Sequence, residues 1–510
     1  MRGRQPPKQT PRLYLLLFAV ILLSAAAYAL FYLVGPSAYD DDPIYLMLAN
    51  QLAHSSLAQS NYIYTARLFQ IIPIAIFFKL FGVGVISSGA WDFICYLGVV
   101  AVAFYFTKEV YDARAGVISA ALVSIFPLLV RSATTATESV PMAFVTSLAI
   151  LALLYGWRRD SAKWYLASGF IAISSFMVTP EGAIAIIFSA LALAYLTLTK
   201  GLRRKSVWII CGAAVALLLM FCLNYAYFGN PLHSFTLNNA YYNDPTISSV
   251  LTSGTQGLMY YPYILFPYNN GVDINQVGPY FYFLVAATVY LLIRRESKAH
   301  FALAWFWFML AYLEIGPMHI SLYPSLGYVM IYGVARFLLI TAVPMAAILG
   351  IALSRALAHE GKATISVSRA MAIIALVAIA VSSLSLNSYW HSVAYLSSYD
   401  QIAISGYLSN LPNSTTVYLP SDLTNIYSYL RFDNLSRFKT LMQIRNCTDF
   451  ASGSYVVSAD PFQVINSSFY HYVSTCQNLR LISLPRPSNS TPYYGELHSN
   501  IIDLNLYRVV

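Results

Sequence analysis

Charged side chains are scarce in this sequence. They make up 10% of the 510 residues, while apolar residues make up 58% and the mean hydropathy is +0.60. Soluble domains carry about 25% charged residues, so this composition favours a protein embedded mostly in lipid. The net charge of +9 arises from short basic clusters between apolar runs. Because no single basic patch forms, we expect no nucleic-acid partner.

Several motifs of cofactor chemistry are also absent. The sequence has no Gly-rich phosphate loop, no His-x-x-x-His or Cys-x-x-Cys spacing and no nucleophile elbow, and its eight His residues are scattered. A nucleotide-dependent reaction therefore has no support, and the sequence identifies no certain cofactor. The sequence leaves open whether a divalent metal ion binds at the acidic cluster of the first loop.

Long apolar runs are abundant instead. Runs of about 17 to 25 residues can cross a bilayer. Eleven such spans are predicted, at 12–34, 84–107, 115–131, 139–157, 164–179, 181–199, 206–228, 277–293, 300–316, 333–353 and 370–386. If the N-terminus is cytoplasmic, 19 of the 30 Lys and Arg residues lie in cytoplasmic connections, as the positive-inside rule requires. The first run is too long for a cleaved signal peptide, so we expect it to be retained.

From about residue 387 the sequence changes to a soluble pattern. Strand-like runs at 416–419, 454–457, 479–482 and 504–510 alternate with helical patterns near 399–410 and 421–431. We therefore predict a polytopic α-helical membrane domain over 1–386 and a small α/β domain over 387–510. An odd number of spans places this second domain on the extracytoplasmic side.

Two further signals agree with that placement. All five Asn-x-Ser/Thr triplets, the acceptors of N-glycosylation, lie in the second domain, at Asn413, Asn434, Asn446, Asn466 and Asn489. Cys447 and Cys476 are the two cysteines of that domain, and a disulfide between them suits an oxidising compartment.

Carboxylates at the outer membrane edge are the main candidates for chemistry, because a charge at that depth is costly. Asp40, Asp41 and Asp42 precede Pro43 at the expected start of a helix. They either cap this helix or include a general base that deprotonates an acceptor hydroxyl while a sugar leaves a phosphate. Glu138, Glu181 and Glu314 lie in comparable places, and Asp92 lies inside the second span.

Two arginines, Arg131 and Arg336, lie on the outer side, where the predicted topology leaves few cations. A guanidinium group matches a lipid phosphate in shape and charge, so Arg336 is a candidate phosphate ligand. The alternative is that these side chains extend to lipid headgroups.

The first loop carries a recognisable pattern. Asp41-Asp42-Pro43-Ile44-Tyr45 through Ala49 resembles the Asp-Glu/Asp-x-x-Tyr-x-x-x-Ala signature of GT-C fold glycosyltransferases, in particular the protein O-mannosyltransferase and aminoarabinose transferase group. Later motifs of that group have counterparts in the same order. They are an interfacial helix that follows Arg67 and ends at Lys79-Leu80-Phe81-Gly82, an acidic position at Thr137-Glu138-Ser139, and Arg336-Phe337-Leu338-Leu339 with Val343-Pro344.

The resemblance covers about 1–386 and implies an inverting transferase that takes a sugar from a polyprenyl or dolichyl phosphate on the extracytoplasmic face. It implies Asp41 as the base, supported by Asp42 and Glu138. The substrate-binding candidates are Asp40, Tyr45, Arg67, Arg131, Glu181 and Arg336. The sequence departs from the pattern at Thr179, where relatives often carry a basic residue, and it lacks the Trp-Trp-Asp signature of oligosaccharyltransferases.

Two other classes of protein compete with this interpretation. A transporter or lipid flippase would place ionisable residues near the bilayer midplane, whereas here the acids gather at the outer edge and Asp92 is the only clear intramembrane one. A glycosylated scaffold would use the spans as an anchor only. If the protein is a transferase, we expect a lipid-linked sugar donor and a glycan, lipid or protein acceptor. We expect it in either an archaeal cell membrane, which we favour, or the endoplasmic reticulum.

Overall fold

The protein is described here by a computed structural model. It describes residues 11–32, 35, 42–54, 63–201, 203–242, 261, 265, 277, 279–315, 335–358, 365–419, 437–440, 444, 446–458, 476–484 and 505–510. The helices of the first domain are α1 (Pro11–Phe31), α2 (Asp42–His54), α3 (Leu68–Phe81), α4 (Val85–Val110), α5 (Ala113–Ser124), α6 (Pro127–Ser132), α7 (Ser139–Arg159), α8 (Ala162–Val178), α9 (Ala183–Lys200), α10 (Trp208–Phe228), α11 (His233–Tyr242), α15 (Tyr280–Ile293), α16 (His300–Ile315), α17 (Ala342–Ala358) and α18 (Ile365–Ser409).

The membrane-spanning character of the chain is confirmed. Within the described ranges, seven helical segments are long and apolar enough to cross a bilayer, and each coincides with a predicted span. The shorter apolar helices α5 and α8 overlap with predicted spans, and α15 and α16 lie within them. The fold is thus a polytopic helical one, while the count of eleven spans stays a prediction.

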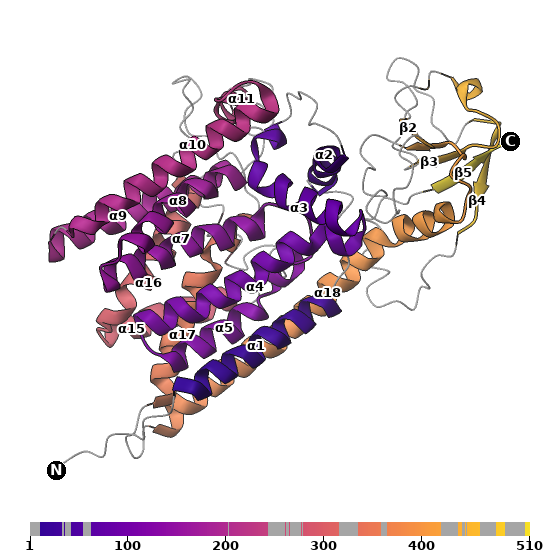
Figure 1. The fold of residues 1–510 in the computed structure, drawn as a ribbon. Coiled ribbons are helices and arrows are strands. Elements are labelled where there is room, and N and C mark those ends of the chain that lie inside the picture. The colour runs from indigo at the N-terminus through magenta and orange to yellow at the C-terminus, as the bar shows by residue number, and fades with distance from the viewer. Residues whose placement is uncertain are drawn as a thin grey trace, which may run out of the picture.

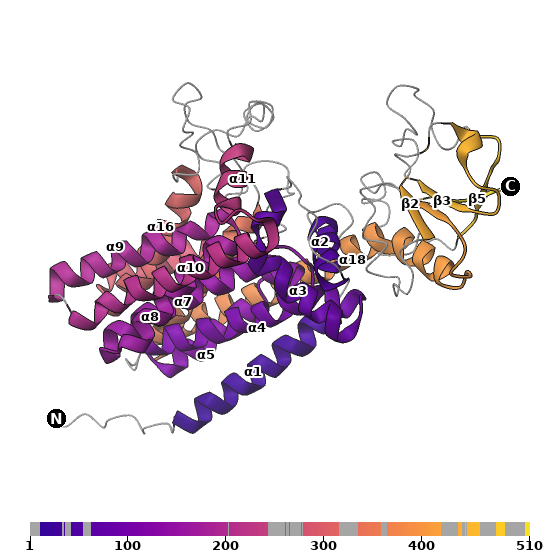
Figure 2. The ribbon, with the colours of Figure 1, turned by 45° about the horizontal axis from the view of Figure 1, so that its top comes forward.

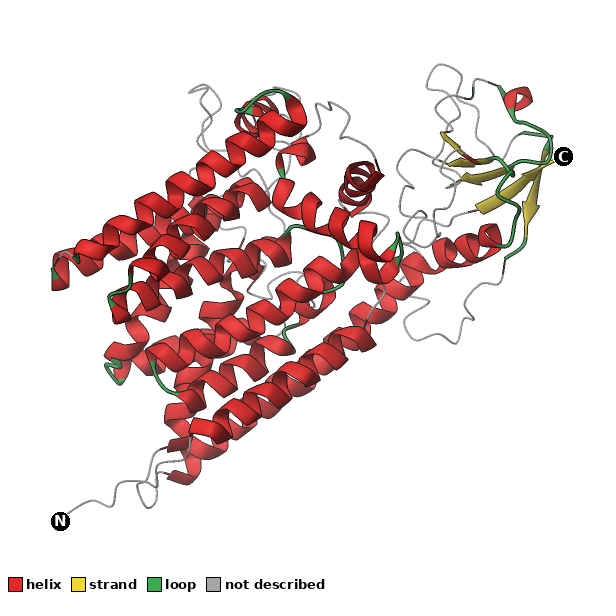
Figure 3. Ribbon diagram, viewed as in Figure 1, coloured by secondary structure: helices red, strands yellow, loops and turns green. Residues whose placement is uncertain are grey.

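The bundle has two different ends. Figures 1 and 2 show the N-terminus at one end, together with the connections from α9 to α10 and from α15 to α16. At the other end lie α2, α3 and α11, and α18 continues past this end into the C-terminal domain. Figure 3 shows the same division, with every strand gathered beyond the helices. Helix α2, which begins at Asp42, thus lies at the end that faces the C-terminal domain.

The predicted span 115–131 is interrupted. Helix α5 ends at Ser124 and α6 begins with Pro127, which has no backbone N–H to continue the helix. Carbonyl groups at the end of α5 therefore lack helical partners. Side chains of α4, α15 and α18 donate to them instead, as Tyr96 Oη to Ser124 (2.6 Å), Tyr280 Oη to Leu122 (2.7 Å) and Asn387 Nδ2 to Ile125 (3.1 Å).

Helices α8 and α10 cross in close contact. A side chain at Gly169 would collide with the carbonyl of Ile209, and one at Gly212 would collide with the carbonyl of Leu166. Small residues of this kind let helix backbones approach closely in membranes, where van der Waals packing replaces the hydrophobic effect. This crossing fixes α10 against the bundle beside α9.

The C-terminal domain contains a mixed five-stranded sheet. Its strands are β1 (Val417–Leu419), β2 (Phe438–Thr440), β3 (Tyr455–Ser458), β4 (Leu479–Ile482) and β5 (Asn505–Val509), in the order β2-β1-β3-β5-β4. The pairs β1–β2 and β1–β3 are parallel, and β5 pairs antiparallel with β3 and β4. Four strands coincide with the predicted runs, and β2 is additional.

Helix α18 joins the two parts without a break. It passes through the predicted boundary at 386/387, and its last turns bury Ile404 and Leu408 against β1 and β3. The predicted helix at 399–410 is thus the end of α18, while 421–431 lies outside the described residues. The position of the domain boundary stays a prediction.

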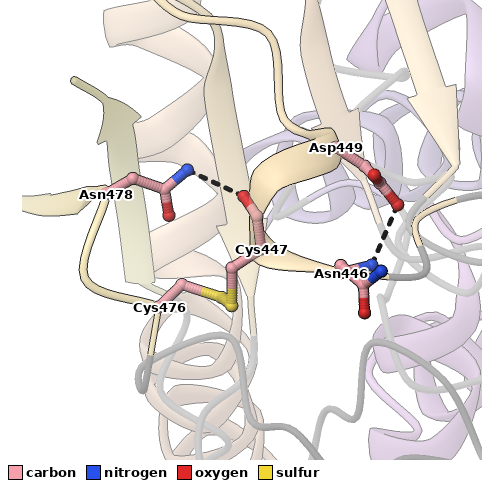
Figure 4. The surroundings of a disulfide bond; sticks show 5 residues. All are labelled: Asn446, Cys447, Asp449, Cys476 and Asn478. Carbon is pink, nitrogen blue, oxygen red and sulfur yellow. Dashed lines mark hydrogen bonds between the residues drawn. A yellow bond between two sulfur atoms is a disulfide. The ribbon is translucent and has the colours of Figure 1, made fainter.

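A disulfide joins Cys447 and Cys476, whose Cα atoms are 5.4 Å apart. Figure 4 shows that Asn478, close to Cys476, donates from Nδ2 to the carbonyl of Cys447 at 2.7 Å. The bridge thus links the short 3-10 helix Cys447–Asp449 to the start of β4.

Two of the predicted glycan acceptors lie in described segments. Asn413 and Asn446 are both exposed, as attachment of a glycan requires. Asn446 precedes the helix Cys447–Asp449, where its backbone N–H donates to Asp449 (Figure 4). Asn434, Asn466 and Asn489 lie outside the described residues, and glycosylation at all five positions stays a prediction.

The hydroxyl of Tyr280 is expected to stabilise the break after α5. Tyr280→Phe leaves the Leu122 carbonyl without this donor, which should cost about 1 kcal/mol. Thermal unfolding of the purified protein in detergent measures the effect. Tyr195→Phe is the control, because that side chain is 65% exposed on α9. Equal melting temperatures for both variants would contradict the assigned role.

The disulfide is expected to stabilise the C-terminal domain by about 3 kcal/mol, since it closes a loop of 29 residues. Cys447→Ser should therefore make this domain sensitive to limited proteolysis while the helical part resists. Cys211→Ser, a change of an exposed free cysteine on α10, is the control. The same protease resistance in both variants would show that the bridge adds no stability.

Candidate active site

The first helix after α1 begins at the acidic cluster. Asp42 is the first residue of α2, and it is fully buried. Its charge interacts with that of Asp92 on α4. Asp40 and Asp41 lie outside the described residues, so Asp42 is the member of the cluster whose surroundings are known.

Glu138 is the centre of the site. It lies directly before α7, and its side chain is 1% exposed. Its Oε1 atom contacts two guanidinium groups, Arg67 Nη1 at 3.2 Å and Arg336 Nη2 at 3.6 Å. Three segments that are far apart in the sequence therefore meet at one carboxylate.

Arg67 connects this carboxylate to α2. It follows the 3-10 helix Ile63–Ala66, donates a hydrogen bond to the hydroxyl of Tyr45, and lies 4.9 Å from the ring centre of Tyr64. Tyr45 is fully buried, and its ring packs edge to face against Tyr64. The structure thus brings together Tyr45, Arg67 and Glu138, three of the predicted site residues.

The two arginines keep Glu138 ionised in spite of its burial. Burial is the largest single influence and raises the pKa of Glu138. The cations of Arg67 and Arg336 together outweigh burial, so the pKa of Glu138 lies below its ordinary value. Arg336 lies in the 3-10 helix Ala335–Thr341. Among these three charged residues its side chain is the most exposed, at 19%, compared with 9% for Arg67 and 1% for Glu138. Arg336 is therefore the best placed to contact an anionic ligand.

A second set of contacts fixes the segment that carries Glu138. The side-chain amide of Gln70 on α3 donates to the carbonyls of Ala136 (3.0 Å) and Thr137 (3.1 Å) and to Asp92 Oδ1 (3.2 Å). Gln70 is not among the residues that the sequence motifs predict for the site. The available signal was a polar residue one turn after Arg67 in an otherwise apolar helix.

Glu181 lies beside this group. It occupies the 3-10 helix Pro180–Gly182 before α9, is buried, and accepts a hydrogen bond from the hydroxyl of Thr179. Its charge interacts with those of Arg67 and Glu138. Thr179, which replaces the basic residue expected from the resemblance, thus orients a carboxylate of the site.

Arg131 is placed differently from the other candidates. This exposed residue of α6 lies with its guanidinium 4.1 Å from the ring centre of Trp390 on α18. Its role as a substrate ligand stays a prediction. The contact with Trp390 gives it a structural role where α18 leaves the bundle.

A resident metal ion gains no support from the side chains that are described. Within those segments no group of three or more His, Cys, Asp and Glu residues could hold one. Both contacts of Glu138 Oε1 are to cations, which disfavours a metal ligand at that atom. Asp40 and Asp41 lie outside the described segments, and a metal there stays a prediction.

Comparisons with known proteins agree with this architecture. Residues 71–228 match the family model described as dolichyl-phosphate-mannose-protein mannosyltransferase. This region runs from α3 to α10 and includes Asp92, Glu138 and Glu181. No curated protein matches the chain in sequence.

Solved structures of ArnT from Cupriavidus metallidurans have a similar fold. The structure bound to undecaprenyl phosphate matches with a TM-score of 0.58 at 13% identity, over 98% of each chain. The apo structure matches with a TM-score of 0.55 at 16% identity, over 80% of this chain and 83% of ArnT. The chain thus has the fold of ArnT, the GT-C fold that the motifs predict, and its residues 71–228 are similar to the dolichyl-phosphate-mannose-protein mannosyltransferase family.

Proposed function

We propose that the protein is an inverting membrane glycosyltransferase. It moves a sugar from a polyprenyl- or dolichyl-phosphate donor to an acceptor hydroxyl on the extracytoplasmic face. The observation that carries this proposal is the buried carboxylate of Glu138, which is held by Arg67 and Arg336 beside the acidic start of α2. Such a site offers a base and a phosphate ligand within one enclosed region.

The acceptor is activated by the first-loop acids. A carboxylate of Asp41, with Asp42 next to it, takes the proton of the acceptor hydroxyl, whose oxygen attacks the anomeric carbon of the sugar. The bond from that carbon to the phosphate oxygen breaks in the same step. Because attack and departure occur on opposite faces of the carbon, the configuration at the anomeric centre inverts.

The leaving group is a lipid phosphate with one more negative charge than it had in the donor. Arg336 balances this charge, since it is the most exposed of the three charged groups and a guanidinium can donate two parallel hydrogen bonds to a phosphate. Glu138 and Arg67 hold Arg336 and α2 in position. The solved ArnT complex with undecaprenyl phosphate supports a ligand of this class.

The proposed orientation follows from the two ends of the bundle. Basic connections such as 200–205 and 294–298 lie at the end with the N-terminus, so this end is assigned to the cytoplasm. The candidate site and the C-terminal domain with its glycan acceptors then face outward. An archaeal cell membrane is the favoured location, and the endoplasmic reticulum is the alternative.

Replacement of the first-loop acids tests the proposed base. Asp41→Asn is expected to lower kcat by about a hundredfold to ten-thousandfold, because the acceptor loses its general base, and Asp42→Asn should lower it less. The measurement is transfer of radiolabelled hexose from polyprenyl phosphate by purified protein in detergent, with mass spectrometry to identify the product.

Asp160→Asn is the matched control. Asp160 follows α7 at the opposite end of the bundle, where its half-buried side chain pairs with Lys205 at 3.3 Å, so its replacement should leave turnover unchanged. Full activity in folded Asp41→Asn and Asp42→Asn proteins would exclude the proposed base. Ligand flux into proteoliposomes without a covalent product would favour a transporter.

Arg336 is tested through donor binding. Arg336→Gln should raise the KM for the lipid-linked donor by about tenfold to a hundredfold, because a charge-assisted hydrogen bond to the phosphate is lost. Inhibition by free polyprenyl phosphate should weaken by the same factor. Arg159→Gln, an exposed change at the opposite end, is the control. An unchanged inhibition constant in Arg336→Gln would contradict the assignment.

A further inference from the structure

A cavity of about 800 Å³ lies between α8, α9 and α10, towards the end of the bundle that carries the N-terminus. Its volume is within the range of ordinary ligand sites, about 300 to 1,000 Å³. Most of its lining is small or aliphatic and includes Gly169, Ala172, Ala190, Leu193, Ala194 and Ala213. The candidate active site lies at the opposite end, so this cavity is separate from it.

The cavity follows from the helix packing. Gly169 and Gly212 bring α8 and α10 into direct backbone contact, while Ala190, Ala194 and Ala213 are too short to fill the space beside this contact. Two of the larger apolar side chains that line the cavity are themselves exposed, with Leu198 of α9 87% exposed and Ile210 of α10 66% exposed. Exposure of this kind on spanning helices indicates contact with lipid chains.

Two cations line the same cavity at one end. Arg203 lies 4.7 Å from the ring centre of Trp157, and Arg204 is exposed. The neighbouring Lys205 is engaged by Asp160, and the described residues that line the cavity include no carboxylate. An open apolar groove with two cations in its lining fits an amphiphile that has a hydrocarbon chain and an anionic head.

We propose that this cavity binds one hydrocarbon chain of an anionic phospholipid whose phosphate contacts Arg203 and Arg204. The arginines lie at the depth of the basic connections, where phospholipid headgroups meet the bundle, and guanidinium groups donate well to phosphate oxygens. The small lining residues leave room for the chain. The site is independent of the proposed transferase reaction.

Native mass spectrometry of the delipidated full-length protein tests the proposal. The probes are phosphatidylglycerol and phosphatidylcholine with identical chains, titrated separately. We expect one tightly retained phosphatidylglycerol per chain and weaker phosphatidylcholine. The double change Arg203→Gln and Arg204→Gln should weaken phosphatidylglycerol binding by about 30-fold, since each cation near the surface contributes to binding of an anionic lipid.

Two further variants make the test specific. Arg294→Gln with Arg295→Gln removes the same charge at the same end, away from the cavity, and should leave lipid retention unchanged. Ala190→Trp fills the cavity while both arginines remain, and should abolish retention of either lipid. Thermal unfolding verifies that each variant is folded.

Three outcomes would overturn the proposal. The first is equal retention of both lipids by the wild type. The second is a loss of phosphatidylglycerol in the Arg294 and Arg295 control that equals the loss in the Arg203 and Arg204 variant. The third is retention of a polyprenyl phosphate in preference to phosphatidylglycerol, which would assign the cavity to a different lipid.

Discussion

The carboxylate of Glu138 is buried where the helical bundle meets the first loop, and the surrounding structure depends on its two arginine partners. A buried charge is costly unless it is paired, and removing one partner typically costs about 3 to 5 kcal/mol. Arg67 brings α2 and α3 to this point, and Arg336 brings the segment before α17. The same ion pairs therefore contribute to folding and to the proposed chemistry, because they hold charged groups in position in a buried site.

Much of this site could be predicted from the sequence. Tyr45, Arg67, Glu138 and Arg336 each belong to a recognisable motif, and charges at membrane depth are few enough to be singled out. Gln70 could not be found in this way, because no motif marks it and its three acceptors come from other segments. These long-range hydrogen bonds exist only after α3, α4 and the start of α7 have packed.

Other features of the fold also depend on contacts between distant segments, which the sequence does not reveal. Hydropathy locates the helices, and Pro127 indicates where one must break, but the donors that satisfy the broken end come from helices far away in the sequence. The strand β2 has only three residues and no alternating pattern, so it is defined by its pairing with β1. The contact of Arg131 with Trp390 could not be predicted either, because nothing in the segment of Arg131 indicated that Trp390 would lie against it.

The continuous helix α18 has a mechanical consequence. With 45 residues and a rise of about 1.5 Å per residue, it extends roughly 68 Å from the membrane domain to the sheet. Its middle is tied to α1, where Asn387 and Ser388 meet Tyr28 and Tyr32, and its far end is part of the core of the second domain. Because α18 is one continuous helix, a small change in the tilt of its membrane segment displaces the sheet sideways by a much larger distance.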